Sequence, residues 1–148
     1  MLRSLLTSAG IVPLVDVHAH CDLPCGVYDP AQARIEAQSV KACMEKYAAS
    51  DDPIFQARAI EIKEQRSHMV KEHLWVLWTD YFKPVHLETY PDLHDKIWKA
   101  TKLCSAAKVG VDLETAEALL AAVEEIHNIF WATKGGKPEW MTTDPTTA

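Results

Sequence analysis

The sequence has little glycine, few cysteines and no long apolar run. Only 5 of its 148 residues are glycine. Long stretches rich in Ala, Leu, Glu, Lys and Gln contain neither glycine nor proline, a composition that favours helices over sheets. Four cysteines are too few for a disulfide-stapled scaffold of this length. No run reaches the ~20 apolar residues that a membrane span requires, so we expect a soluble protein with no membrane partner.

An excess of positive charge is also missing. The formal net charge is −6, and clusters of Lys and Arg that could neutralise phosphates are not visible. We therefore expect no nucleic-acid partner, and an anionic substrate would need local steering. Because 48% of the residues are hydrophobic, the chain can bury one core, which predicts a single domain.

Four helices are predicted from their start and stop signals. Asp29-Pro30 and Asp52-Pro53 each combine an N-cap residue with proline at the first helical position. The second helix is predicted to run to about Tyr81, and the other two follow Pro91 and Asp112 and end before Gly110 and Gly135. Apolar residues alternate three and four positions apart along the helices. This spacing predicts an all-α protein, an up-down-up-down four-helix bundle.

The second predicted helix has one charge inside its apolar stripe. The stripe is predicted to contain Phe55, Ala59, Ile62, Met69 and Val76, with Val70, Leu74 and Leu77 beside it. Arg66 interrupts it, and a charge on an apolar seam is costly unless it is paired. We therefore expect Arg66 to have a partner.

The segment HCDLPCGVYDP, residues 20–30, places one imidazole and two thiols within six residues. Cys21 and Cys25 can reach one metal ion only if the chain between them turns back sharply. Pro24 and Gly26 supply a restricted and a permissive backbone at suitable places. A loop with two free thiols, or a cysteine pair that oxidises, explains a bare Cys-x3-Cys pattern equally well.

The pattern H-C-x-x-P-C-G-x-Y resembles, position for position, the metal-binding hook of nickel superoxide dismutases, and the match continues through Asp29 and Pro30. The resemblance spans most of residues 20–134. Four further residues fall where that family carries the residues around its metal ligands: Glu36, Arg66, Tyr81 and Lys83.

This resemblance implies a cofactor and a reaction. One nickel ion per chain is expected at the amino terminus of His20, the backbone nitrogen of Cys21 and the thiolates of Cys21 and Cys25, with the His20 imidazole as an axial ligand in the oxidised state. Square-planar nitrogen and sulfur donors suit Ni(II). The expected function is that of an antioxidant oxidoreductase, which converts superoxide to oxygen and hydrogen peroxide.

The resemblance also implies roles for residues around the metal. Tyr28 and Tyr81 are expected to order water and to control entry of the anion, and Asp22 is expected to fix the hook through hydrogen bonds. Glu36 and Arg66 are expected to lie around the imidazole of the axial ligand.

The expected amine ligand implies that the chain is cleaved before His20, because a nitrogen inside a peptide bond cannot bind metal as an amine. We expect residues 1–19 to be a propeptide that a maturation peptidase removes. The mature chain is then 20–148, with the hook at 20–28, the bundle at about 29–134 and a tail at 135–148. The family resemblance further implies a homohexamer. We favour cytoplasmic processing, although the apolar character of residues 1–19 leaves export or organelle targeting open.

Two other classes of protein remain as alternatives. A non-catalytic helical bundle that binds Cu(I), Zn or Ni through Cys21 and Cys25 needs no free amine and no Tyr28. A helical interaction protein with an incidental cysteine pair leaves the other matching positions unexplained. Cys43 and Cys104, on or near apolar helix faces, are expected to be inert thiols outside the site.

Overall fold

The computed structural model describes residues 26–136 and 139–142, and within them all regular structure is helical. The long helices are α2 (Ala31–Ala48), α3 (Pro53–Val76), α5 (Leu93–Val109) and α6 (Leu113–Thr133). A π-helical turn, η1 (Leu77–Tyr81), continues α3, and a short helix, α4 (Pro84–Thr89), follows it. None of these helices is both long and apolar enough to cross a bilayer.

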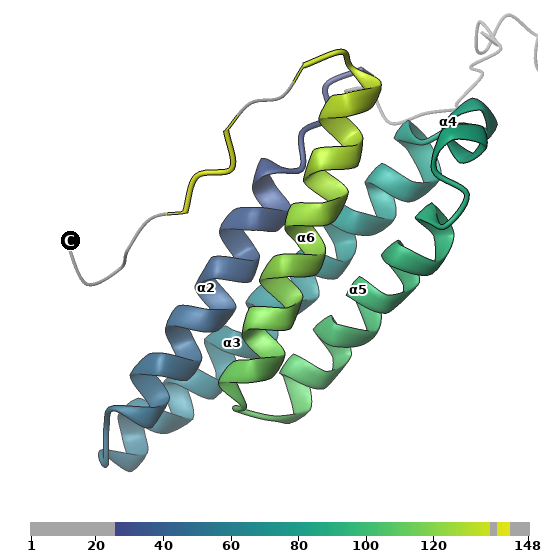
Figure 1. Ribbon diagram of the computed structural model, residues 1–148. Helices are drawn as coiled ribbons and strands as arrows, with labels where there is room; N and C mark the ends of the chain where they lie inside the picture. The colour runs from purple at the N-terminus through teal and green to yellow at the C-terminus, as the bar shows by residue number, and fades with distance from the viewer. Residues whose placement is uncertain (1–25, 137–138, 143–148) are drawn as a thin grey trace, which may run out of the picture.

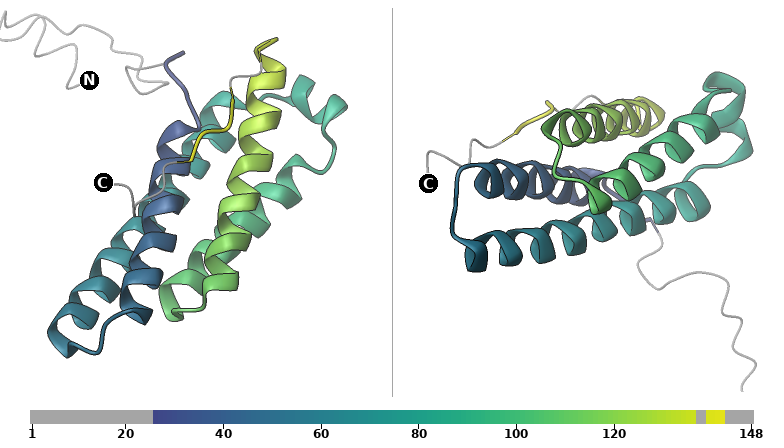
Figure 2. Two further views of the ribbon diagram at one scale, coloured as in Figure 1. Left: turned by 60° about the vertical axis from the view of Figure 1, so that its left-hand side comes forward. Right: turned by 90° about the horizontal axis from the view of Figure 1, so that it is seen from below.

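The long helices run alternately up and down and close into a four-membered bundle (Figure 1). α2 packs against α3 and α6, and α5 packs against the same two helices on the other side (Figure 2). The predicted all-α four-helix bundle is confirmed. The start of α2, the η1 turn, α4 and the end of α6 all lie at one end of the bundle, which we call the tyrosine end because Tyr28 and Tyr81 lie there.

Aspartate side chains cap the helix starts that the sequence predicts. Asp52 accepts a hydrogen bond from the backbone nitrogen of Ile54 at 3.0 Å. Asp112 accepts hydrogen bonds from the backbone nitrogens of residues 114 and 115 at 3.3 and 3.1 Å. Asp29 accepts one from Ala31 at 2.8 Å, although Pro30 is itself the N-cap, so α2 begins one residue later than predicted. These contacts satisfy backbone donors that a helix start leaves unpaired.

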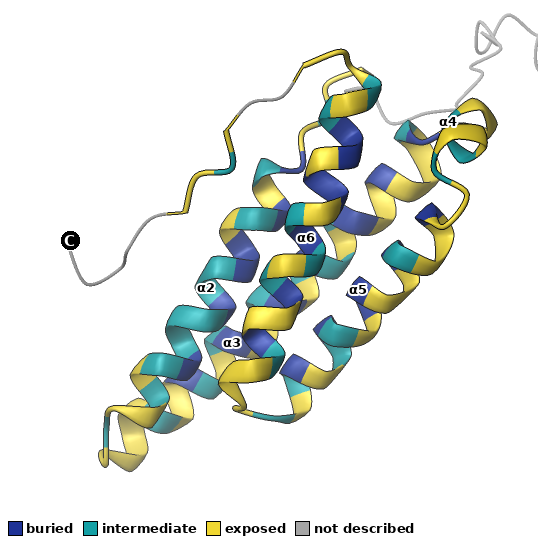
Figure 3. Cartoon of the chain, viewed as in Figure 1, coloured by how far each residue is buried: buried dark blue, intermediate teal, exposed yellow. Residues whose placement is uncertain are grey.

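The core lies along one stripe of each long helix (Figure 3). In α2 and α5 the buried residues recur three and four positions apart, the spacing that the sequence predicts, and Val40 and Ile97 among them are fully or almost fully buried. The predicted stripe of α3 is partly wrong, because Phe55 and Val76 are 39% and 41% exposed. The buried residues of α3 include the predicted Ala59, Val70 and Leu74, together with Lys63 and Ser67, which the sequence did not indicate.

Lys63 is buried among these residues although its side chain is charged. It is only 2% exposed, yet its Nζ donates to the backbone oxygens of Lys108 and Gly110 at 2.8 and 2.6 Å. These oxygens belong to the end of α5, where carbonyls lack helical partners and where the helix dipole favours a cation. Burial lowers the pKa of Lys63. The side chain therefore links α3 to the end of α5.

A segment beyond the bundle, residues 139–142, returns along its flank over α2 and α6 (Figure 2, left). The Trp140 ring lies 5.0 Å from that of His127 on α6, and the Arg34 guanidinium of α2 lies 5.8 Å from the Trp140 ring. Arg34 also donates a hydrogen bond to the backbone oxygen of Met141. These contacts fasten the segment to two helices at once.

Candidate active site

The metal ligands predicted from the sequence, His20, Cys21 and Cys25, lie outside the described residues, as does Asp22. The described chain begins at Gly26, immediately after the last predicted metal ligand, and it enters the bundle at the tyrosine end. Gly26 has a φ of 92°, in the left-handed region that favours glycine. The structure therefore describes the residues around the attachment point of the hook.

Two tyrosines predicted from the family pattern come together at this end. Tyr28 precedes α2, and Tyr81 is the last residue of η1. Their ring centroids are 5.8 Å apart with an interplanar angle of 56°. The Tyr81 ring also lies 4.4 Å from Phe130 on α6 and 5.2 Å from Phe82. Both tyrosines are partly buried, so they form a semi-enclosed aromatic surface beside the point where the hook joins the bundle.

The π-helical turn positions Tyr81. The backbone nitrogen of Phe82 bonds the oxygen of Leu77, five residues back, at 2.9 Å. A π turn takes more residues than an α turn, so it changes the direction in which the following side chains point, and such turns are frequent at functional sites. Leu77 and Phe82 are buried on either side of the turn.

The end of α6 contributes two residues that the sequence pattern does not single out. The hydroxyl of Thr133 lies 2.6 Å from the hydroxyl of Tyr81. The ammonium of Lys134 lies 5.0 Å from the centre of the Tyr81 ring. The sequence offers only an indirect sign of this role for Thr133. The residue follows the buried Phe130 by one turn, and only the bundle topology brings this turn to Tyr81.

Glu36 and Arg66 form an ion pair between α2 and α3. Arg66 Nη1 lies 3.0 and 3.3 Å from the two carboxylate oxygens of Glu36. The Glu36 side chain is 10% exposed and that of Arg66 is 41% exposed. The pairing satisfies a carboxylate that would otherwise be costly to bury. Its arrangement around the His20 imidazole stays a prediction, because His20 lies outside the described residues.

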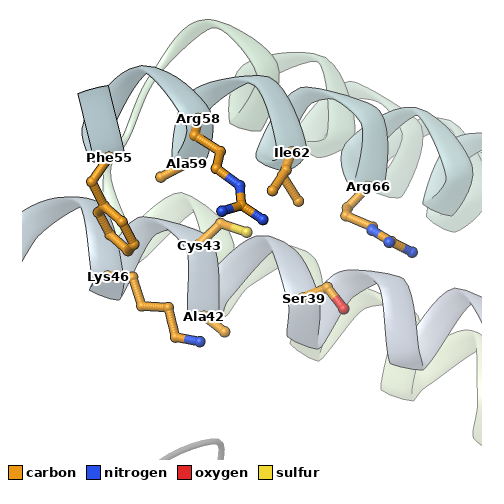
Figure 4. Close-up of a pocket in the computed structure, with 9 residues that line it drawn as sticks. All are labelled: Ser39, Ala42, Cys43, Lys46, Phe55, Arg58, Ala59, Ile62 and Arg66. Carbon is orange, nitrogen blue, oxygen red and sulfur yellow. The ribbon is translucent and has the colours of Figure 1, made fainter. Parts of the chain in front are cut away.

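A pocket of about 460 Å³ extends from Arg66 between α2 and α3, away from the tyrosine end (Figure 4). Its lining is part apolar, as at Phe55 at the far end, and part cationic, with Lys46 and Arg58. Cys43 lies in its wall. The pocket gives the Arg66 side of the pair access to solvent on a protein whose net charge is negative.

The described residues contain no rival metal site. Within 26–136 and 139–142, no three His, Cys, Asp or Glu side chains are grouped closely enough to hold a metal ion. Burial raises the pKa of the Cys104 thiol to about 12 and also raises the pKa of Cys43. Metals bind the thiolate form of cysteine. Burial therefore favours the neutral form of both thiols.

Comparison with known proteins identifies the family. A sequence model of the family described as nickel-containing superoxide dismutase matches residues 15–134. The chain belongs to the nickel superoxide dismutase family. The predicted activity and the nickel cofactor are thereby confirmed: the protein is a nickel-dependent superoxide dismutase, and the non-catalytic alternatives are not favoured.

Individual nickel superoxide dismutases match over most of their length. That of Streptomyces seoulensis is 60% identical over 122 residues, which cover 82% of this chain and 93% of the relative. That of Streptomyces coelicolor is 58% identical over the same shares. The solved structure of a native nickel superoxide dismutase has a TM-score of 0.76 at 57% identity and matches 79% of this chain and 100% of its own. A structure with the nickel ligation of a partly reduced state also has a TM-score of 0.76, at 59% identity.

Proposed function

We propose that His20, Cys21 and Cys25 would hold one nickel ion per chain through the amino terminus of His20, the backbone nitrogen of Cys21 and the two thiolates, joined in the oxidised state by the His20 imidazole. Family membership supports this assignment, and so does the preference of Ni(II) for square-planar nitrogen and sulfur donors. Cys43 and Cys104 lie within helices α2 and α5 of the bundle, so Cys21 and Cys25 are the thiols next to His20 in the sequence. Nickel bound there supplies the one-electron oxidation and reduction that superoxide disproportionation requires.

The amine ligand requires residues 1–19 to be removed as a propeptide by a maturation peptidase. Only then does His20 present a free amine. The mature chain is 20–148, with the hook at 20–28, the bundle at about 29–134 and the tail at 135–148. Complete chains of the solved relatives correspond to 79% of this chain, so a shorter form suffices for the fold.

Glu36 and Arg66 position the His20 imidazole. A carboxylate that accepts from an imidazole N–H fixes the orientation of the ring and raises its strength as a ligand. Arg66 donates from one nitrogen, Nη1, to both oxygens of Glu36, and the carboxylate keeps further lone pairs that can accept from the N–H of the ring. The limited exposure of Glu36 supports a fixed rather than a mobile partner.

Tyr28 and Tyr81 order water and control entry of superoxide, and Asp22 fixes the hook by hydrogen bonds. The 5.8 Å approach of the two rings beside the attachment point of the hook supports the role of the tyrosines. Their hydroxyls can both donate and accept hydrogen bonds, which suits the handling of water next to an anion.

The mature enzyme assembles as a homohexamer in the cytoplasm. Support for association comes from indole rings on the surface of the isolated chain, since Trp75, Trp78 and Trp98 are 42%, 38% and 58% exposed. Large aromatic side chains are enriched at subunit interfaces. Light scattering on the processed protein tests this assembly, and a monomeric mass would contradict it.

The experiment that tests the proposed site compares two purified forms, one beginning at His20 and one that retains residues 1–19. We expect about one nickel per chain and dismutase activity only in the His20 form. Cys25→Ser in the His20 form should lose the nickel, whereas Cys43→Ser, the matched control, should retain it. Equal nickel binding by both forms, or nickel loss in Cys43→Ser alone, would refute the hook assignment.

A further inference from the structure

The Thr133 hydroxyl lies between two oxygen atoms. It lies 2.6 Å from the backbone oxygen of Phe130 and 2.6 Å from the phenol oxygen of Tyr81. A carbonyl oxygen can only accept, and a threonine hydroxyl has a single proton to donate. Thr133 therefore donates to Phe130. Consequently Tyr81 is the donor in the contact between the two hydroxyls.

The Tyr81 ring has little freedom to choose another partner. Phe130 lies 4.4 Å from its centre, His86 stacks on it at 5.6 Å with an interplanar angle of 21°, and the Lys134 ammonium lies at 5.0 Å. Tyr28 lies on it at 5.8 Å. Contacts from several segments thus fix the ring, and the remaining rotation, that of the O–H bond, is set by Thr133.

We propose that Thr133 is a positioning residue for superoxide dismutation: it holds the phenol proton of Tyr81 toward α6, so that the phenol oxygen faces the tyrosine pair as a hydrogen-bond acceptor. This inference rests on the role of Tyr81 under the proposed function. A water molecule beside the pair then donates to Tyr81, and its own oxygen is left oriented to accept from another donor. Thr133 acts on the reaction only through this orientation.

The test compares four variants of the nickel-loaded enzyme that begins at His20. Thr133→Val removes the acceptor for Tyr81, and Thr133→Ser restores a hydroxyl. Tyr81→Phe removes the phenol itself. Thr101→Val is the matched control, because Thr101 makes the same bond to the carbonyl three residues back, 2.8 Å from its hydroxyl to the oxygen of Trp98, in the middle of α5.

We expect Thr133→Val to lower kcat/KM by about three- to tenfold, the scale of one hydrogen bond, and to approach the activity of Tyr81→Phe. Thr133→Ser should recover most of the loss, and Thr101→Val should lower thermal stability without a change in kcat/KM. Adding Thr133→Val to Tyr81→Phe should cost no further activity, because both changes remove the same contact.

A second measurement follows the hydrogen bond without the metal. The protein has four tyrosines, so selective ¹³C labelling at the ζ carbon gives four NMR signals in the nickel-free chain, and Tyr81→Phe assigns one of them. That signal should move in Thr133→Val, return toward its original position in Thr133→Ser and stay unchanged in Thr101→Val.

Two outcomes overturn the inference in distinguishable ways. Wild-type kcat/KM and an unmoved Tyr81 signal in Thr133→Val, with Tyr81→Phe impaired, would refute the role of Thr133 alone. Full activity in Tyr81→Phe would refute the role of Tyr81 in the proposed function, and the role of Thr133 with it.

Discussion

Arg66 is the partner of a carboxylate that lies almost entirely inside the bundle. Replacing Arg66 with methionine largely preserves the length of the side chain but leaves the Glu36 carboxylate without its ion-pair partner. Because Arg66 is itself 41% exposed and water can take part of its place, we expect the free energy of unfolding to fall by about 1–3 kcal/mol in Arg66→Met. Urea denaturation measures this change. Lys99→Met, which breaks an exposed pair with Asp95, should cost below about 0.5 kcal/mol, and equal losses in the two variants would contradict the prediction.

The buried thiol of Cys104 should make the free energy of unfolding fall at alkaline pH. Burial raises the pKa of its thiol from the ordinary value of 9.0 to about 12 in the folded chain. The unfolded chain therefore ionises first, so the contribution of the neutral thiol is complete below pH 9 and is lost as the pH rises toward 12. Relative to Cys104→Ala, the native chain should lose roughly 1.4 kcal/mol by pH 10. Denaturation of both proteins under reducing conditions measures this difference, which would stay constant with pH if the thiol were not protected.

At the scale of elements, the long helices could be predicted because their signals are local. Asp52 and Asp112 cap helices in the way that the sequence indicates. The π turn could not be predicted, since Leu-Trp-Thr-Asp-Tyr contains no helix breaker and the same residues fit an α-helix. Its form reflects packing of Tyr81 and Phe82 on other elements. Pro84 indicates the end of the second helix, but proline also suits a first turn, and it begins α4.

Replacing Lys63 tests whether a side chain of α3 stabilises the last turn of α5. Lys63→Met removes the donor to the oxygens of Lys108 and Gly110 but preserves apolar packing. We expect a loss of about 1–3 kcal/mol in the free energy of unfolding, with faster amide hydrogen exchange in the last turn of α5. Lys102→Met, an exposed lysine of the same helix, serves as the control. Unchanged exchange at the end of α5 would show that the lysine does not hold it.

For the whole molecule, the family pattern indicated contacts such as that of Glu36 with Arg66, but it gave no sign of contacts that depend only on how the bundle closes. The hook pattern is contiguous and was therefore visible, and Arg66 was recognisable because a charge stood on an apolar stripe. Thr133 was not recognisable, because nothing in its local sequence distinguishes it from an ordinary residue near a helix end. Its contact with Tyr81 depends on closure of the bundle, which brings the end of α6 to the end of α3.

The segment 139–142 is expected to stabilise the folded chain without taking part in the chemistry. It lies beyond the residues that the family shares. Trp140→Ala removes its contacts with His127 and Arg34, so we expect the melting temperature to fall by about 3–6 °C at unchanged dismutase activity. Val109→Ala, where the side chain is 92% exposed, is the control. A drop in melting temperature no larger than that of the control would contradict the role of the segment.

The direction of this segment also decides where the protein can be modified. If the amine of His20 binds nickel, an affinity tag or a fluorophore cannot be fused there without blocking the metal. The opposite end of the chain is suitable, because residues 139–142 contact Arg34 of α2 and run along the flank of that helix, away from the end of α6 (Figure 2). Fusions and surface tethers placed after residue 142 should therefore leave the nickel end open to its substrate.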